Sequence, residues 1–323
     1  MHKSSVCKLI LIFIFSAIAS FAATPEFLYV AATYVRIRDA AATSGKVVAT
    51  LPIGTWAKII EVSDKTETLL GKNEHWYKIS TENQQQGWIF GGLTRVTTQE
   101  NRFEVALQII TAQTKAENKN TEDLMQTLDF AVSIKELASH STEKAQLELA
   151  FLETLDRVYS ALSTAGKGDD GKHNSVKNYQ NLCYYHESAG QYFVKPEAFW
   201  ELAEEYADII EAADEIAWAA ATQILPGETE GDPDMMIYFF EKSYGRYIES
   251  YPEGKHVSTA LEKASDIVDY VSKNLSYYES DESKEQLKKK LGWFEDLAGV
   301  TPESEARKKL SASIKQLVNG LSH

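Results

Sequence analysis

Cys183 and His186 come nearest, in residue type and spacing, to a nucleophile or metal site. They are three residues apart in a stretch, Ser175 to Tyr192, that we predict to be helical, so both side chains would face one point. A cysteine–histidine pair of this kind binds metal or forms a thiolate nucleophile. The intervening and preceding residues are apolar, however, and no further ligand follows nearby in the sequence. We therefore interpret the cysteine as a small packed side chain.

Carboxylates are the second candidate chemistry, because pairs of them serve acid–base catalysis or bind metal. One predicted helix, Pro196 to Ile224, carries six acids at three- and four-residue steps that share a face: Glu201, Glu204, Glu205, Asp208, Glu211 and Glu215. The opposite face is apolar, which favours a solvated acidic face. Two acidic loops, Gly168 to Gly171 and Glu228 to Asp234, lack the ligand spacing of a known calcium loop. We predict no catalytic residue, no metal site and no cofactor.

The chain has 323 residues, which is enough for a small domain and a larger one. Its 33 lysines and arginines face 47 aspartates and glutamates, and the net charge is −14 with histidine neutral. Such a surface repels nucleic acid and anionic lipid headgroups. This charge excludes nucleic acid as a partner and favours simple solubility or a basic partner.

The first 22 residues have the layout of a secretory signal peptide. A basic start precedes the apolar run from Leu9 to Phe15, and small residues lead to a cleavage position after Ala22. The apolar run is shorter than the ~20 residues of a spanning helix, and no cysteine stands at the cut for lipid attachment. We predict a periplasmic or secreted protein with no membrane insertion after cleavage. Cys183 would remain alone, so no internal disulfide forms.

Residues 26–97 show short apolar and β-branched runs separated by turn residues, which is typical of strands. The runs are Phe27 to Ala31, Tyr34 to Arg38, Val47 to Leu51, Trp56 to Val62, Trp76 to Ser80 and Trp88 to Phe90. The polar segment from Asp64 to Glu74 is predicted to be a loop. Short strands at this close spacing favour a closed barrel, because closure removes exposed edges.

Four motifs in this stretch resemble the bacterial SH3 (SH3b) domain in their order and spacing. They are V-R-I-R-D from Val35, I-G-T from Ile53, W-Y-K-I from Trp76 and G-W-I from Gly87. The resemblance implies a small barrel that docks peptide or peptidoglycan. Ala40-Ala41 stands where the family has Gly-Pro, in a loop that borders the ligand groove of such barrels.

Strand alternation separates the predicted core from the predicted binding surface. If Ile79 and Ile89 point into the barrel with Val35 and Ile37, the residues that alternate with these four along the strands point outward. A cluster of large outward aromatics marks a binding groove. The predicted ligand-binding residues are Tyr34, Arg36, Arg38, Trp76, Trp88 and Phe90.

Residues 98–323 carry helical periodicity with start and stop signals. A capping box from Thr97 to Glu100 predicts the first helix start. The expected helices span 101–115, 121–138, 142–164, 175–192, 196–224, 233–250, 255–275, 283–297 and 302–321. Short connections predict helical hairpins, arranged as a bundle or a short solenoid. Tyr244 to Pro252, followed by Ala260, resembles the helix-turn-helix of tetratricopeptide-like envelope proteins.

These patterns predict an α+β multidomain chain, in which a small SH3-like β-barrel precedes an all-α helical-hairpin domain. The function that they favour is an exported, non-enzymatic binding or scaffold protein of the bacterial cell envelope. The barrel would dock a peptide or peptidoglycan, and the helical domain would engage an envelope protein partner. Two alternatives stay open: a cell-wall hydrolase that uses the helical carboxylates, and a purely structural envelope protein.

Overall fold

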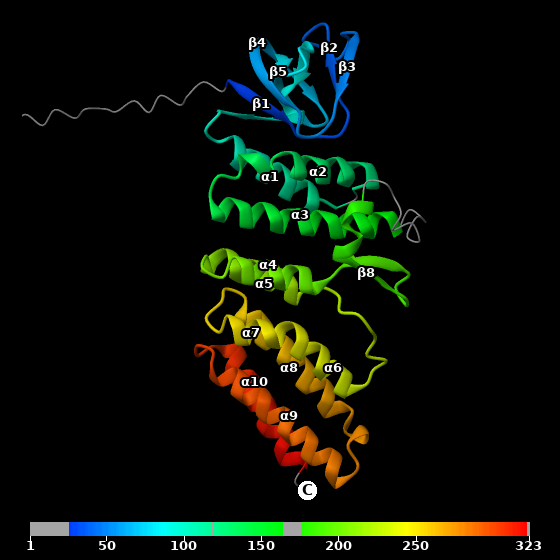
Figure 1. The fold of residues 1–323 in the computed structure, drawn as a ribbon, viewed down its shortest axis with the longest axis vertical. Helices are drawn as coiled ribbons and strands as arrows, with labels where there is room; N and C mark the ends of the chain where they lie inside the picture. The colour runs from blue at the N-terminus through cyan, green and yellow to red at the C-terminus, as the bar shows by residue number, and fades with distance from the viewer. Residues whose placement is uncertain (1–25, 118, 164–175, 322–323) are drawn as a thin grey trace, which may run out of the picture.

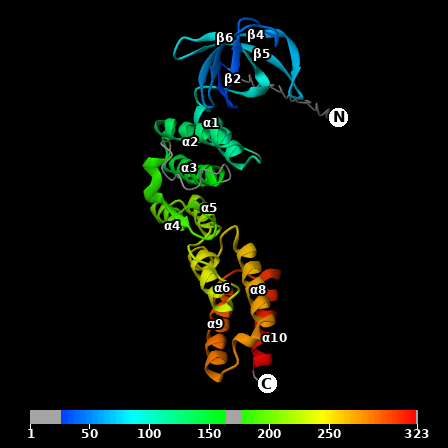
Figure 2. The ribbon, with the colours of Figure 1, turned by 90° about the vertical axis from the view of Figure 1, so that its right-hand side faces the viewer.

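The computed structural model describes residues 26–117, 119–163 and 176–321. The predicted signal peptide, residues 1–22, and the acidic loop 168–171 lie outside the described residues. The chain forms an elongated stack with the β-rich part at one end and the last two helices at the other (Figures 1 and 2). It therefore has the predicted α+β architecture, with an SH3-like curled sheet before a helical region.

The N-terminal part is an antiparallel sheet with the strand order β3-β2-β6-β5-β4-β1-β7. Its strands are β1 (Phe27–Val30), β2 (Val35–Arg38), β3 (Val47–Leu51), β4 (Trp56–Leu69), β5 (Lys72–Thr81), β6 (Gln86–Phe90) and β7 (Thr94–Thr97). The sheet curls so that alternate side chains meet inside. The prediction that Val35, Ile37, Ile79 and Ile89 form this core is confirmed, because all four are buried in one cluster.

Strands β4 and β5 form a long hairpin that extends beyond the core. The two-residue turn, Leu70-Gly71, has positive φ at both residues (53° and 74°), as a tight hairpin turn requires. The register shifts between Val62 and Thr66, which marks a bulge. The predicted loop from Asp64 to Glu74 is therefore wrong. Most side chains in this extension are exposed, so the sequence there lacks the alternation that signals a strand.

The helical region stacks along the long axis in layers: α1–α3 beside the sheet, then α4 and α5, then α6–α8, then α9 and α10 (Figure 2). A π-helical segment, Glu241–Gly245, joins α6 to α7. The helices are α1 (Arg102–Lys115), α2 (Thr121–Ser133), α3 (Ser141–Leu162), α4 (Pro196–Glu205), α5 (Ile210–Ala221), α6 (Pro233–Phe240), α7 (Arg246–Ser250), α8 (Val257–Lys273), α9 (Asp281–Gly299) and α10 (Glu305–Leu321).

Three expectations about this region are wrong. The stretch predicted as the helix 175–192 contains a 3₁₀ helix, Lys177–Leu182, and leads into the hairpin β8 (Cys183–His186) and β9 (Gln191–Val194). Its aromatic residues suit a strand, and Gly190 takes the positive φ of the turn. The predicted helix 196–224 is broken between α4 and α5.

The third error is the capping box. Thr97 ends β7, and α1 begins only at Arg102, after Asn101, whose side chain makes no capping bond. The Thr97 hydroxyl instead donates to the carbonyl of Thr98. Four residues, 98–101, therefore connect β7 to α1, whereas a capping box at Thr97 would start the helix directly after the strand.

The sheet and the first helices share a hydrophobic core, which joins them into one body. Tyr29 and Ile53 from the sheet pack in one cluster with Phe103 of α1 and Phe130 of α2. Gly54, with φ of 81°, lies so close that an added Cβ would meet the Phe130 ring at 2.1 Å. This packing fixes the orientation of the sheet on α1 and α2.

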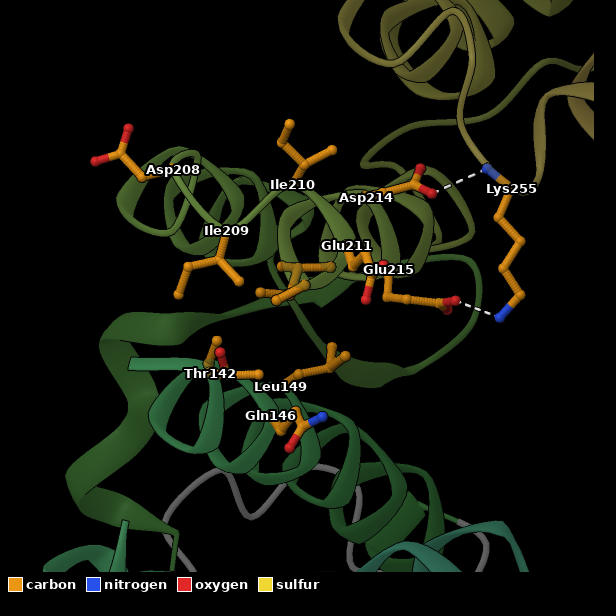
Figure 3. A pocket seen from close by; sticks show the side chains of 13 residues that line it. Thr142, Gln146, Leu149, Asp208, Ile209, Ile210, Glu211, Asp214, Glu215 and Lys255 are labelled. Carbon is orange, nitrogen blue, oxygen red and sulfur yellow. Dashed lines mark hydrogen bonds and ion pairs between the residues drawn. The ribbon is translucent and has the colours of Figure 1, made fainter. Parts of the chain in front are cut away.

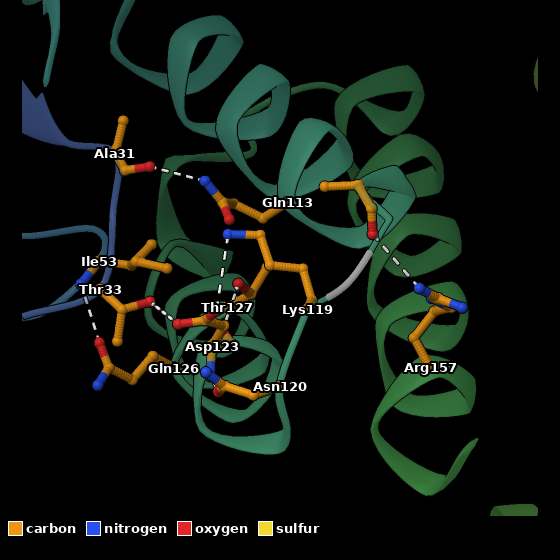
Figure 4. A network of polar contacts seen from close by, with 11 residues as sticks. Ala31, Thr33, Ile53, Gln113, Lys119, Asn120, Asp123, Gln126, Thr127 and Arg157 are labelled. Atoms are coloured by element: carbon orange, nitrogen blue, oxygen red, sulfur yellow. Dashed lines mark hydrogen bonds and ion pairs between the residues drawn. The ribbon is translucent and has the colours of Figure 1, made fainter. Parts of the chain in front are cut away.

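Polar contacts border this shared core (Figure 4). Gln113 of α1 donates to the carbonyl of Ala31 at 2.7 Å, and the amide of Ile53 donates to Gln126 of α2 at 3.2 Å. The Thr33 hydroxyl donates to Asp123. The loops at this end of the sheet thus contact α1 and α2. Among the described residues, no helix is both long and apolar enough to cross a membrane.

Candidate ligand-binding surface

The outward face of β2, β6 and β5 holds five of the six predicted ligand-binding residues, but its two ends differ. At one end Trp76 and Phe90 occupy paired positions on β5 and β6 and are each only 2% exposed. Their rings pack edge to face with centroids 5.6 Å apart. The expectation that these two aromatics are open to solvent is therefore wrong.

Glu67, near the tip of β4, closes this end. Its carboxylate accepts the Trp76 indole N–H at 2.8 Å, and the hydroxyl and amide of Thr43 at 2.6 and 3.2 Å. Thr43 belongs to the loop between β2 and β3, so one carboxylate ties that loop to the long hairpin. The hydrogen bond from the Thr43 hydroxyl, with smaller help from Trp76, lowers the pKa of Glu67 below 4.5. We call Trp76, Phe90, Glu67 and Thr43 the closed end.

The other end is accessible. Trp88 pairs across the sheet with Arg38 on β2 and with Lys78 on β5, so a half-buried indole lies between two cations. Arg36, two residues before Arg38 on the same side of β2, is exposed and makes no hydrogen bond or ion pair within the described part of the chain. We call Arg38, Lys78 and Trp88 the open end. Arg36 is its exposed neighbour on β2, on the side toward Phe90, because β2 and β6 are antiparallel.

The cations of the open end differ in how far they are already engaged. Arg38 donates to the carbonyl of Gly45 at 2.6 Å, which orients its guanidinium. Lys78 lies 3.7 Å from Glu61, and both side chains are well exposed, so this pair is weak. Lys78 was not among the ligand-binding residues predicted from the sequence, although the alternation that places Ile79 inside also places Lys78 outside.

The open end can bind an anionic group beside an apolar one. A guanidinium matches a carboxylate in a two-bond geometry, and an indole offers a flat apolar face. Both features come from the strand pairing and need no rearrangement.

Tyr34, the sixth predicted residue, lies elsewhere. Its side chain is 56% exposed, yet its hydroxyl donates to Glu122 of α2 at 2.6 Å. Tyr34 therefore helps join the sheet to the helical region, and the structure does not place it with the open end.

Comparison with known protein families finds a match within this sheet. Residues 33–94 match the family model of the bacterial SH3 domain. Residues 33–94 are thus similar to a bacterial SH3 domain, and we call them the SH3 domain. It covers about a fifth of the chain and ends before the first helix. No curated protein and no solved structure matches the chain.

The loop in which this SH3 domain departs from the family motif is tightly closed. The Asp39 carboxylate accepts the amide of Lys46 at 2.8 Å, and the amide of Gly45 donates to the carbonyl of Ala42 at 3.0 Å. Together with the bond from Arg38 to Gly45, these contacts hold the loop without the Gly-Pro of the motif.

The cysteine–histidine candidate does not form a site. Cys183 and His186 lie on one strand at an odd spacing, so their side chains point to opposite faces. Cys183 is 7% exposed, and burial raises the pKa of its thiol to about 12. The interpretation of a packed thiol is confirmed, since a thiol with this pKa is protonated at neutral pH.

The row of carboxylates is divided by the break between α4 and α5. Glu204 pairs with Arg246 at 3.0 Å, and Glu215 pairs with Lys255 and His256. In the acidic loop before α6, Asp232 caps the helix by accepting the amide of Asp234 at 2.8 Å. Within the described residues, no group of three or more histidine, cysteine or acidic side chains is arranged to hold a metal ion.

Two half-buried carboxylates of α3 were not predicted from the sequence. Burial raises the pKa of both Glu153 and Asp156. Asp156 accepts the amide of Val194 on β9 at 3.0 Å, which fastens the β8–β9 hairpin to α3. This bond gives Asp156 a structural role.

Proposed function

We propose that this chain is an exported, non-enzymatic binding protein of the cell envelope. Its SH3 domain docks a peptide or the peptide part of peptidoglycan at the open end, and its helical region engages a protein partner. The proposal of export rests on residues 1–22, whose sequence has the layout of a signal peptide.

One observation carries the proposal: Trp88 lies in register between Arg38 and Lys78 on a face that the helical region leaves free. The helices pack on a different part of the sheet, around Tyr29 and Ile53. An anionic peptide could thus reach the open end while the SH3 domain stays fixed to α1 and α2. The acidic remainder of the chain makes this cationic patch a local exception.

Retention by purified, insoluble peptidoglycan tests the proposal. The mature chain should sediment with peptidoglycan, and Trp88→Ala should lose at least about nine-tenths of this retention, because an indole contact is a frequent hot spot. Tyr277→Ala is the control, since it removes an aromatic side chain that solvent reaches (56% exposed) in the helical region. Equal retention of Trp88→Ala and wild-type protein would reject the open end as the docking surface.

The same preparation separates the two alternatives. A cell-wall hydrolase would release soluble muropeptides during incubation, and chromatography of the supernatant would detect them. A purely structural protein would neither sediment with peptidoglycan nor release fragments. We expect sedimentation without release, and fractionation of cells should place the mature chain outside the cytoplasm.

A further inference from the structure

Two hollows flank the first turn of α5. Figure 3 shows the residues that line the first of them. The first lies between α3 and α5, and has Leu149 and Ile209 in its lining; its volume is about 770 Å³. The second lies between α4, α5 and the turn after α7, and has Trp200 and Tyr251 in its lining; its volume is also about 770 Å³. Each is in the size range of small-ligand and side-chain pockets.

Ile210 forms the ridge between the hollows and contributes to the lining of both. It is 73% exposed, whereas Ile216 on the same helix is 1% exposed. A single exposed isoleucine is ordinary on a protein surface. Here it stands between two partly apolar hollows, so a bound chain would cover an apolar surface that is continuous from one hollow to the other.

The free charges around Ile210 are negative. Asp208 and Glu211 are exposed, and neither forms a hydrogen bond or ion pair within the described part of the chain. The two cations at the rim are already engaged: Lys255 pairs with Glu215, and Arg246 pairs with Glu204. Arg246 also lies over the Trp200 ring, 4.2 Å from its centroid. An incoming cation would therefore meet unpaired carboxylates.

We propose that these two hollows and the Ile210 ridge, which we name the α5 groove, bind an extended, positively charged segment of a partner protein. An apolar side chain of that segment packs beside Ile210, and its lysines or arginines pair with Asp208 and Glu211. This inference rests on the part of the proposed function that gives the helical region a protein partner, and it names that partner's chemistry.

Charge complementarity selects this occupant over two others. The ligand proposed for the SH3 domain is anionic, and the unpaired carboxylates of the α5 groove would repel it. A second copy of the chain would bring a net charge of −14 toward an acidic groove, which like-charge repulsion opposes. A cationic segment with an apolar side chain satisfies both features of the groove.

Fluorescence anisotropy with three short synthetic peptides tests the inference on the mature chain. The first peptide alternates lysine and leucine, the second replaces leucine by serine, and the third replaces lysine by glutamate. We expect saturable binding of the lysine–leucine peptide and much weaker binding of the other two. Ile210→Ser should weaken the binding of the first peptide about tenfold, because the partner's apolar side chain loses its contact.

Matched variants control for general acidity. Asp208→Asn combined with Glu211→Gln should weaken binding about threefold to tenfold at low salt, with a smaller difference at high salt. Glu279→Gln combined with Glu282→Gln changes the net charge equally at a distant site. Val300→Ser removes another well-exposed β-branched apolar side chain (59%). Both controls should bind like wild type.

The outcomes are distinguishable. Equal effects of groove variants and their controls, or equal binding of the lysine–serine and lysine–leucine peptides, would overturn the α5 groove assignment. Self-association that Ile210→Ser abolishes, without peptide binding, would overturn it in favour of a second copy. Trp88→Ala should leave peptide binding unchanged, so loss of retention by peptidoglycan and loss of peptide binding report separately on the SH3 domain and the groove.

Discussion

The closed and open ends of the SH3 domain lie on the same face of the same strands, yet they differ in burial. Trp76 and Phe90 are buried, and Glu67 accepts the Trp76 indole N–H, whereas Trp88 is half-buried between Arg38 and Lys78. Two tryptophans of equal strand parity thus differ in exposure. The side of a sheet to which a residue points therefore does not determine whether its side chain meets solvent.

The largest expected effect concerns stability. Trp76→Ala should lower the free energy of unfolding by about 3–5 kcal/mol, because removal of the buried indole leaves a cavity in its place. Trp88→Ala should change it by no more than about 1 kcal/mol, since Trp88 is half-buried at a face without a cover. Urea unfolding followed by circular dichroism measures both. Similar losses for the two variants would contradict the distinction between the ends.

The next effect concerns binding. Arg36→Glu should weaken binding of a soluble anionic stem peptide about tenfold at low salt, because a free cation becomes a like charge. Lys65→Glu makes the same charge change on the β4 strand near the closed end, and should have a small effect. Titration calorimetry at two salt concentrations checks both. A larger effect of Lys65→Glu would move the binding surface to the long hairpin.

A smaller effect tests the contacts of Glu67. Thr43→Ala removes the hydroxyl donor and should destabilise the protein by at most about 1 kcal/mol, because the bond is exposed. It should also speed hydrogen exchange at the Trp76 indole N–H, which Glu67 accepts. Unchanged exchange would show that Thr43 does not hold Glu67 over Trp76.

The smallest effect is a pH dependence. Because the pKa of Glu67 is lowered in the folded protein, its contribution to stability is full above 4.5 and declines as pH falls through the folded pKa. Acidification should therefore shift the Trp76 indole N–H resonance as Glu67 is protonated, before global unfolding. In Glu67→Gln this step should be missing. Its persistence in that variant would assign the step to another carboxylate.

Much of the SH3 domain could be predicted from its sequence, because alternating apolar residues and short turns report directly on strands with one buried face. Val35 and Ile37 are examples that the structure confirms. The burial of Trp76 could not be predicted, because it depends on β4 and β5 extending through a polar segment that carries no alternation.

The helical region shows the same division. The helix beginning at Pro196 was predictable from its proline and apolar stripe, and α4 begins there. The break after Glu205 was not, because Tyr206 and Ile209 continue the apolar spacing through the turn. That break divides the predicted acidic face between α4 and α5. The α5 groove has no local sequence signal, because its lining comes from three packed layers of helices.

The most direct test of the central claim is a titration of the mature chain with a soluble anionic stem peptide, followed by NMR of the indole N–H groups. The chain has six tryptophans, and single Trp→Phe variants assign their signals. We expect the Trp88 resonance to shift saturably while the Trp76 resonance stays in place. A saturable shift of Trp76 without one of Trp88 would contradict the claim that the open end is the ligand-binding surface.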